Sequence, residues 1–307
     1  MPHMTLRRLL NDKNITIVAF LLPALVLYGT FVIIPIFQSF RFSLYHWDGL
    51  GPLTRFIGLE NYATLLHDET FWQALRNNFA LVGFSLVTQL PPAVLLAVLL
   101  TGAMRGRDFF RTMFFSPQIL SAVATGYLFY YIYEPTFGLL NQALKLLGLG
   151  TLARGWLGDQ MLALPAVLVV ISWRHIGFYM VLFMAAIEGI PDEIFEAAQI
   201  DGCNKRQLVW HITLPLMSGA IRTAAVLAMV GSIKYFDLIW IMTRGGPVHA
   251  SELIATYMYK ETFLNWHMGY GATLAFALFV VAFAVSLLFL RLTSRGERAE
   301  EAALAAM

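Results

Sequence analysis

The sequence has 307 residues, of which 58% are hydrophobic and only 13% are charged, and its formal net charge is +2. Ordinary soluble domains carry about one-quarter charged residues, so this composition indicates a membrane protein and excludes a soluble globular chain. A net charge this close to zero gives no reason to expect a nucleic-acid partner. The single cysteine, Cys203, excludes an intrachain disulfide.

Six apolar stretches are long enough to cross a bilayer, whose hydrocarbon core is about 30 Å thick and needs about 20 helical residues. We expect spans near residues 15–40, 77–101, 110–133, 162–187, 216–242 and 271–292. The first is too long for the core of a secretory signal and has no small-residue cleavage site after it, so it is expected to be retained. The predicted fold class is all-α: a polytopic membrane protein with six transmembrane helices in one domain, residues 1–307.

The connections between these spans carry unequal numbers of Lys and Arg. More fall on the side that holds both chain ends, with Arg7 and Arg8 at the start and Arg105 and Arg107 after the second span. Because cytoplasmic connections are enriched in Lys and Arg, we expect both termini in the cytoplasm. The same count puts the polar segment 190–215 on the cytoplasmic side.

This polar segment, residues 190–215, is the longest polar interruption in the second half of the chain. Pro191 precedes acidic residues in the first turns of a predicted helix, where the helix dipole favours negative charge. These acidic residues are Asp192, Glu193 and Glu196. Gly202 predicts a sharp reversal because glycine reaches positive φ at little cost, and a second short helix would follow before Pro215. The pattern indicates an amphipathic helical hairpin that lies against a membrane surface or a partner.

Motifs in and around this hairpin resemble those of a known family. Glu196-Ala197-Ala198, with Gly202 four residues later and Ile212-Thr213-Leu214-Pro215 beyond it, resembles the EAA signature of the membrane subunits of bacterial ATP-driven, binding-protein-dependent importers. The fragments 243–247 and 56–62 resemble the carbohydrate-uptake branch of that family, including the larger maltose-transporter permease and the first permeases of glycerol-phosphate and lactose type. The resemblance covers nearly the whole chain.

The resemblance implies that this hairpin is a coupling helix hairpin, which docks into a cleft of an ATPase subunit and moves with it. The residues that match the signature would make the contact: Glu196, Ala197, Ala198, Gly202, Ile212, Leu214 and Pro215. The implied partners are a second homologous permease, an ATPase dimer that holds ATP and Mg, an external solute-binding protein, and the lipid of the bacterial inner membrane. The implied function is import of a sugar or oligosaccharide by alternating access.

The resemblance also implies a substrate path in the middle of the membrane. With the length from Pro215 to Pro247 matched to the maltose permease, the stretch 228–235 falls where that protein lines its sugar site. Counting back from Glu196 puts His175 and Phe178 on the matching face of the preceding helix, next to the ionisable Arg174. The expected path residues are Arg174, His175, Phe178, Ala228, Gly231, Ser232, Lys234 and Tyr235. Ionisable groups at this depth cost several kcal/mol and usually face a cavity or a partner. Lys234 and Asp237, three residues apart on one predicted helix, are placed to pair.

Other interpretations remain open at this stage. Arg174, Lys234 and Asp237 would also suit helix packing or contact with a partner subunit. The cations would suit an anionic solute, such as glycerol phosphate or an acidic or sulfonated sugar. A secondary transporter would use Lys234 and Asp237 as an ion relay, although the sequence has no visible inverted halves.

The sequence offers no sign of catalytic chemistry. It contains no phosphate-binding loop, no metal-ligand spacing among its His and Cys residues, and no nucleophile with a nearby base. We therefore expect a transport subunit that is not an enzyme, with no metal or cofactor on this chain. ATP hydrolysis would then belong to a separate ATPase subunit.

Overall fold

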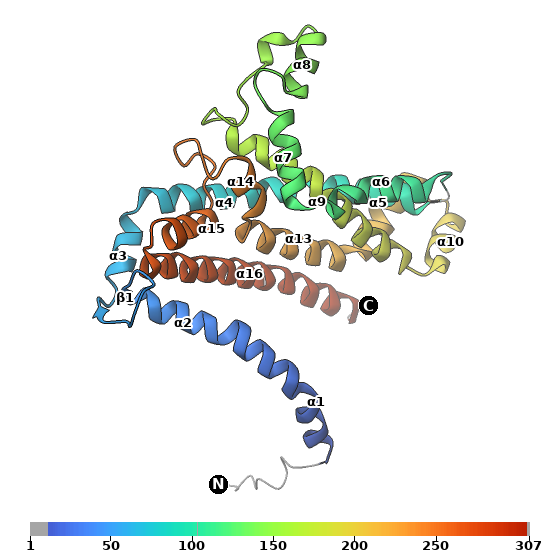
Figure 1. Cartoon of the computed structure of the whole chain (residues 1–307). Coiled ribbons are helices and arrows are strands. Elements are labelled where there is room, and N and C mark those ends of the chain that lie inside the picture. Colours follow the sequence, from blue (N-terminus) through green and yellow to red (C-terminus); the bar gives the residue numbers. More distant parts are fainter. Residues whose placement is uncertain (1–11, 103, 306–307) are drawn as a thin grey trace. The chain divides into compact units, whose positions relative to one another are not determined.

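The computed structural model describes residues 12–102 and 104–305, with side chains from residue 17 to residue 291. This part of the chain is helical except for connecting turns and two short strands (Figure 1). Its contacts divide it into two units, Met1–Leu66 with Lys260–Phe276, and His67–Tyr259 with Ala277–Met307. Arg7 and Arg8, on which the expected orientation partly depends, lie outside the described residues.

The first unit joins the N-terminal helix to a small strand pair. Its elements are α1 (Asp12–Tyr28), the π-helix η2 (Gly29–Ile33), α2 (Ile34–Ser43), β1 (Tyr45–His46), β2 (Arg55–Phe56), most of α3 (Glu60–His67), the π-helix η5 (Lys260–Leu264) and the start of α16 (Met268–Ala305). The strands are antiparallel, with Tyr45 opposite Phe56.

The motif 56–62 contacts the end of α2. Asn61 donates to the carbonyls of Ser43 and Tyr45 at 2.8 and 3.3 Å. The hydroxyl of Tyr62 lies 2.7 Å from that of Ser43, and burial raises the pKa of Tyr62. Hydrogen bonds from the motif 56–62 therefore hold the strand pair against the end of α2.

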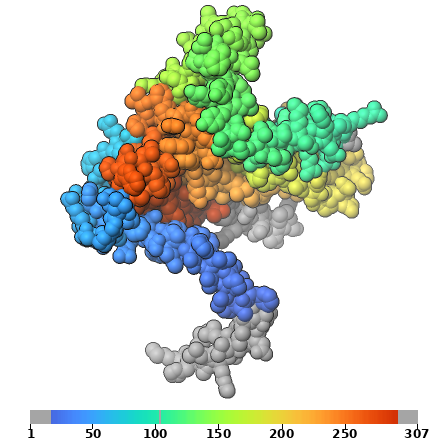
Figure 2. Space-filling model, in the orientation of Figure 1, coloured from blue at the N-terminus to red at the C-terminus, as the bar shows by residue number. Residues whose placement is uncertain are grey.

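The second unit is a helical bundle around α9 (Ala163–Glu188). Its other elements are α4 (Glu69–Thr88), α5 (Leu90–Thr101), α6 (Arg107–Ile119), α7 (Ala122–Ile132), α8 (Leu139–Leu146), the 3₁₀-helix η3 (Gly150–Leu152), α10 (Asp192–Ile200), α11 (Lys205–Leu208), the π-helix η4 (Val209–Thr213), α12 (Leu214–Leu216), α13 (Ser218–Ile233), α14 (Asp237–Met242), α15 (Ile254–Tyr259) and the rest of α16. Helix α9 contacts α4, α5, α6, α13 and α14. The segment around α8 projects from the rest of this unit (Figure 2).

Small residues let the helices of the second unit approach α9 closely. Ala93 and Ala97 of α5 are fully buried against α9, in a cluster with Met180 and Phe183. On another side of α9, a Cβ at Gly177 would collide with the backbone of α6. The centre of this bundle therefore depends on close backbone packing, as is typical of helices in membranes.

Five helical segments in the described residues are long and apolar enough to cross a membrane. They are Ile17–Ser43, Glu69–Thr101, Ala163–Glu188, Ser218–Met242 and Met268–Arg291. These overlap five of the expected spans. With 26 residues at about 1.5 Å each, α9 is roughly 39 Å long and exceeds the apolar thickness of a bilayer.

The expected span 110–133 is not a single helix, which corrects the prediction for that region. Helix α6 ends at Ile119, Leu120 has an extended backbone with ψ of 139°, and α7 begins at Ala122. Pro117 lacks an N–H group, which weakens the last turn of α6. The side chain of Ser121 then accepts the N–H of Ala124 at 3.1 Å and starts a new helix.

The expected pairing of Lys234 with Asp237 is also wrong. Helix α13 ends before Lys234 and α14 starts at Asp237, so the two residues do not share a helix. Both are exposed, and within the described part of the chain neither forms an ion pair. The helix can end here because Asn78 donates to the carbonyls of Ser232 and Ile233, at 3.3 and 2.9 Å, and satisfies them.

Candidate functional site

The polar segment 190–215 forms two short helices around a turn, as the sequence predicts. Helix α10 follows Pro191, and Asp192 and Glu193 lie in its first turn. Their carboxylates are near the free N–H groups at the helix start, where negative charge is stabilising. Further along α10, Glu196 and Ala197 are exposed. Ala198 is buried.

Gly202 ends α10 in the left-handed conformation that glycine adopts most readily. Its φ is +83°, and a Cβ there would meet no atom within 4 Å, so the need for glycine is conformational rather than steric. The N–H of Gly202 donates to the carbonyl of Gln199 at 3.1 Å, and that of Cys203 donates to the carbonyl of Ala198 at 2.9 Å. These two bonds are the Schellman pattern, which satisfies the last carbonyls of a helix.

Asn204 starts α11 with a reciprocal cap. Its side chain accepts the N–H of Gln207 at 2.9 Å, and the side chain of Gln207 accepts the N–H of Asn204 at 2.9 Å. Ile212 in η4 and Leu214 after it are partly buried, and Pro215 is exposed. Both turns of the hairpin are thus held by contacts between residues close in sequence.

The hairpin exposes large apolar side chains beside its acidic ones. Ile200 is 86% exposed and Trp210 is 61% exposed. Glu196 and Ala197 lie on the exposed part of the same hairpin. A small surface that combines an acidic group with uncovered apolar side chains is typical of a contact site for another chain.

A second group of predicted site residues meets at the middle of α9. The rings of His175 and Tyr235 are in edge-to-face contact, with centroids 6.1 Å apart. Arg174 donates from Nη2 to the carbonyl of Leu120 at 3.1 Å, at the break between α6 and α7. The hydroxyl of Tyr235 and the Nε of Arg174 are buried, and neither has a hydrogen-bond partner among the described residues. The structure therefore brings Arg174, His175 and Tyr235 together and leaves two buried donors without a partner among the described residues.

The remaining path residues have different surroundings. Ser232 is buried, and its hydroxyl donates to that of Ser85 at 3.1 Å, so it is already partnered within the protein. Ala228 is buried in helix packing. Phe178 and Gly231 are exposed, and a Cβ at Gly231 would meet nothing within 4 Å. Phe178 and Gly231 are thus accessible, whereas Ser232 and Ala228 contribute to packing.

Polar side chains of α4 and of the break after it complete this layer, and they were not among the predicted site residues. Gln89 donates to the hydroxyl of Ser85 at 2.9 Å, at the break between α4 and α5. The hydroxyl of Thr88 lies 2.6 Å from that of Ser172 on α9. The sequence could have indicated these residues, because hydroxyl and amide groups inside the apolar run 77–101 must each find a hydrogen-bond partner.

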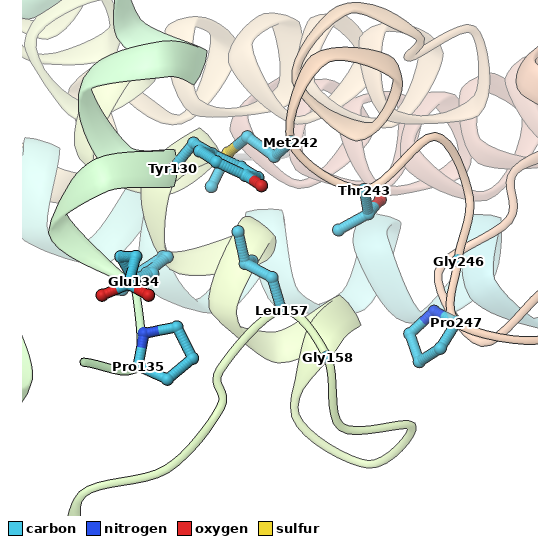
Figure 3. Close-up of a pocket in the computed structure, with 10 residues that line it drawn as sticks. Tyr130, Glu134, Pro135, Leu157, Gly158, Met242, Thr243, Gly246 and Pro247 are labelled. Atoms are coloured by element: carbon cyan, nitrogen blue, oxygen red, sulfur yellow. The ribbon is translucent and has the colours of Figure 1, made fainter. Parts of the chain in front are cut away.

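A cavity of about 420 Å³ opens at the end of α9 away from the hairpin (Figure 3). Its walls come from the end of α7, the turn before α9 and the turn after α14. The lining residues are Tyr130, Tyr133, Glu134, Pro135, Leu157, Gly158, Met242, Thr243, Gly246 and Pro247. The cavity thus includes part of the motif 243–247 that contributed to the family resemblance.

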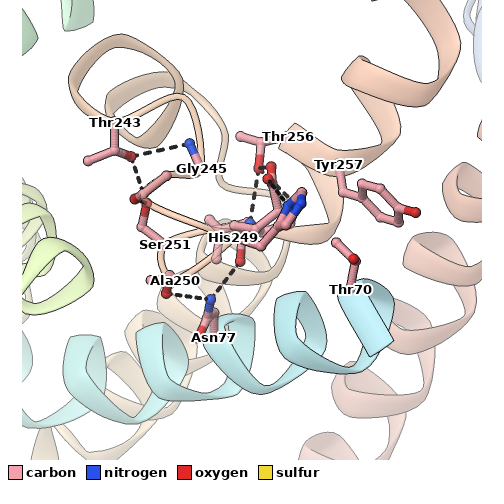
Figure 4. A network of polar contacts seen from close by, with 12 residues as sticks. Thr70, Asn77, Thr243, Gly245, His249, Ala250, Ser251, Thr256 and Tyr257 are labelled. Carbon is pink, nitrogen blue, oxygen red and sulfur yellow. Dashed lines mark hydrogen bonds and ion pairs between the residues drawn. The ribbon is translucent and has the colours of Figure 1, made fainter. Parts of the chain in front are cut away.

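The turn that follows α14, residues 243–257, encloses a buried carboxylate (Figure 4). Glu252 has no exposed surface; it accepts a bond from the Thr256 hydroxyl at 2.6 Å and lies 2.9 Å from Nδ1 of His249. Gly245, with φ of +78°, leaves room for this carboxylate where a Cβ would collide with it. These contacts join residues within the turn, so the buried carboxylate stabilises its backbone path. The described residues contain no group of three His, Cys, Asp or Glu that could hold a metal ion.

Two amides of α4 attach this turn to the bundle. Asn77 donates to the carbonyls of Ala250 and Glu252 at 3.0 and 2.8 Å (Figure 4). The Oδ1 of Asn78 accepts the N–H of Ile254 at 3.0 Å. Because Asn78 also satisfies the end of α13, one side chain joins three segments that are far apart in the sequence.

The chain is similar in sequence to membrane subunits of known transport systems. Residues 73–295 match the family described as binding-protein-dependent transport system inner membrane component. The chain is 38% identical over 291 residues to the probable ABC transporter permease protein YurN of Bacillus subtilis (strain 168), covering 94% of this chain and 99% of that protein. It is 33% identical over 305 residues to the diacetylchitobiose uptake system permease protein NgcF of Streptomyces coelicolor, covering 95% of this chain and 86% of that protein.

A solved structure has the same fold. The chain resembles a chain in the crystal structure of a bacterial ABC transporter involved in the import of the acidic polysaccharide alginate. The TM-score is 0.80 with 24% sequence identity, and the match covers 92% of this chain and 96% of the other. At this identity the likeness concerns the arrangement of helices and not the solute.

Proposed function

The chain belongs to the family of binding-protein-dependent transport system inner membrane components, and on that premise we propose that it is the membrane-spanning permease subunit of an ATP-driven sugar importer. The transported solute is a sugar or oligosaccharide delivered by an external solute-binding protein. The relative NgcF, which takes part in diacetylchitobiose uptake, supports a carbohydrate as the solute class. The five long apolar helices agree with a membrane location.

The hairpin 190–215 is the observation that carries this proposal. It is exposed, it is held by its own caps, and it offers Glu196 and Ala197 beside the uncovered Ile200. An exposed, locally capped element with such a surface suits docking into a cleft of an ATPase subunit. The role of the hairpin in this chain is to transmit movement of the ATPase dimer, which binds ATP and Mg, to the membrane helices.

The proposed topology has six crossings with both termini in the cytoplasm. The five long helices supply five of them, and the broken pair α6 and α7 supplies the sixth. Breaks in membrane helices are tolerated where protein groups satisfy the freed backbone, and Arg174 does so at Leu120. A second homologous permease would complete the translocation path.

The solute would pass the polar layer at the middle of α9. The unpartnered hydroxyl of Tyr235 and Nε of Arg174 are donors that match the hydroxyl oxygens of a sugar. Accessible Phe178 supplies an aromatic surface at the same helix. An ion relay through Lys234 and Asp237 is not favoured, because Lys234 follows the end of α13, Asp237 starts α14, and the two residues do not pair.

The test of coupling uses the complete importer, reconstituted with its second permease, ATPase and binding protein. We expect Gly202→Leu and Glu196→Lys to assemble normally but to lose the ATP hydrolysis that a sugar-loaded binding protein stimulates. Gly202→Leu forces a residue with a Cβ into positive φ at the docking turn. Gly219→Ala is the matched control, because Gly219 has open space and ordinary φ.

The outcomes separate the docking assignment from the solute class. Normal stimulation in both hairpin variants would contradict docking at the hairpin. Stimulated hydrolysis without uptake of any sugar in the wild-type importer would instead contradict the solute class.

Cys203, the sole thiol, tests the orientation. It lies directly after Gly202 in the hairpin, so a membrane-impermeant maleimide should label it in inverted vesicles and not in intact cells. Labelling from outside intact cells would reverse the proposed topology.

A further inference from the structure

The cavity beside α7 and the hairpin lie at opposite ends of one helix, α9. Leu157 and Gly158 of the cavity precede α9, and the hairpin follows its last residue, Glu188. Because α9 exceeds the thickness of a bilayer, a cytoplasmic hairpin puts the cavity on the external side. Its volume of about 420 Å³ falls within the range of small-molecule sites, roughly 300–1,000 Å³.

Most polar atoms in the cavity wall already have partners inside the protein. The hydroxyl of Thr243 donates to the carbonyl of Ile239 at 2.9 Å and accepts from Ser251 at 2.7 Å. The hydroxyl of Tyr133 donates to the carbonyl of Ala166 at 3.2 Å. Pro135, Leu157, Met242 and Pro247 add apolar surface (Figure 3). The wall is therefore mostly apolar, with few groups left to orient a ligand.

Tyr130, in the last turn of α7, and Glu134, just beyond its end, are the lining residues that keep polar groups available. Tyr130 is 46% exposed, and its hydroxyl has no partner among the described residues. Oε2 of Glu134 accepts the N–H groups of Phe137 and Thr136, both at 2.6 Å, and these bonds hold the pKa of Glu134 below its usual range. The carboxylate is thus ionised at neutral pH, and Oε1 remains as an acceptor.

This pair of residues selects a ligand by charge and by shape. Glu134 carries the only charge among the lining residues, so the cavity repels phosphates and acidic sugars. A sugar ring suits the pair, because its C–H face packs on an aromatic ring and its hydroxyls donate to a carboxylate. A quaternary ammonium ion would prefer a cage of several rings, whereas only Tyr130 is an exposed ring here.

We propose that this cavity is an outer subsite that binds one ring of a neutral oligosaccharide, with Tyr130 as the platform and Glu134 as the acceptor of its hydroxyl groups. The subsite holds the solute between the binding protein and the polar layer within the membrane. The proposal rests on the proposed function for the solute class and for the side that faces outward.

The test measures sugar binding by the assembled transporter without its binding protein. Saturation-transfer NMR on this complex uses lactose, maltose and diacetylchitobiose as neutral probes, and choline as a cationic probe. We expect transfer to at least one disaccharide, and about tenfold weaker binding in Tyr130→Ala, since a lost aromatic contact is worth about one factor of ten. Tyr131→Ala is the matched control, because Tyr131 is the exposed neighbour outside the cavity.

A second variant tests the carboxylate. Glu134→Gln should weaken binding of the same disaccharide, whereas Tyr130→Phe, which keeps the ring, should bind better than Tyr130→Ala. Transfer to no disaccharide, equal binding in Tyr130→Ala and wild type, or preference for choline would each overturn the subsite.

Failure of the subsite and failure of the proposed function have different signatures. ATP-dependent sugar uptake by a complex that shows no Tyr130-dependent binding would remove the subsite and leave the importer function intact. Tyr130-dependent sugar binding by a complex that takes up no sugar would support the subsite and contradict the importer function.

Discussion

The hairpin 190–215 lies at one end of α9 and the turn 243–257 lies at the other. The two segments differ in the range of the hydrogen bonds that hold them. The hairpin is closed by bonds between neighbours in sequence, at Gly202 and Asn204. The turn is held by Glu252, which has no exposed surface, and by Asn77, more than 170 residues earlier in the chain. Local closure leaves the surface of the hairpin free for another protein, whereas the turn is fixed to its own bundle.

This difference predicts how each region responds to substitution. Changes in the turn should lower the stability of the whole bundle, because they remove bonds between distant segments. Changes in the hairpin should act locally and appear in coupling before they appear in stability.

Replacing Glu252 tests the turn most severely. Glu252→Ala removes a buried carboxylate and leaves the Thr256 hydroxyl and a cavity behind. We expect the free energy of unfolding to fall by about 2–4 kcal/mol, measured from thermal unfolding of the purified complex. Glu252→Gln, which keeps the shape, should lose less. An unchanged unfolding midpoint in the alanine variant would contradict the structural role of this network.

Asn78→Leu tests the amide that joins three segments. It frees the carbonyls at the end of α13 and the N–H of Ile254, so stability should fall by about 1–3 kcal/mol. Gln142→Leu, on the exposed part of α8, is the control and should change little. Equal unfolding temperatures for the two variants would show that buried amides contribute no more than exposed ones.

Asn204→Ala probes the hairpin by the same kind of change. The loss of the reciprocal cap should cost about 1 kcal/mol locally, so the hairpin is cut faster in limited proteolysis while the unfolding midpoint of the complex stays constant. Gln199→Ala, at an exposed position on α10, serves as the control. If the midpoint fell as far as it does in Asn78→Leu, the contrast between the regions would be lost.

The smallest effect concerns Glu134 and depends on pH. Its pKa is lowered chiefly by the N–H of Phe137, so the stability it contributes is present above the unfolded pKa and is lost as pH falls through the folded one. The difference in unfolding temperature between wild type and Glu134→Gln should therefore exist at neutral pH and vanish in acid. A difference that grows in acid would have the wrong sign for a stabilised carboxylate.

The sequence predicts the parts of this fold that depend on local or compositional rules. Five spans follow from the length of apolar runs, and the turn at Gly202 follows from the conformational freedom of glycine. The roles of the hairpin in coupling and of Tyr235 in the substrate path remain predictions. These predictions rest on the exposure of the hairpin and on the unpartnered hydroxyl of Tyr235.

The errors arose where distant groups decide the backbone. The run 110–133 is long enough and apolar enough as a whole to predict one span, although Pro117 and Ser121 flank the break at Leu120. Lys234 and Asp237 have helical spacing, but Asn78, on another helix, stabilises the helix end that separates them. Spacing within one segment could not reveal either arrangement.

The long-range bonds of α4 have a consequence for the order in which the protein is made. The partners of Asn78 are synthesised much later: the carbonyl of Ser232 comes 154 residues after it and the N–H of Ile254 comes 176 residues after it. At about 5–20 residues per second, the ribosome needs roughly 8–35 seconds to supply these partners. Throughout that interval the amides of Asn77 and Asn78 must bond to water, lipid head groups or the insertion machinery. Helix α4 can therefore form its final hydrogen bonds only after the turn beyond α14 has been translated.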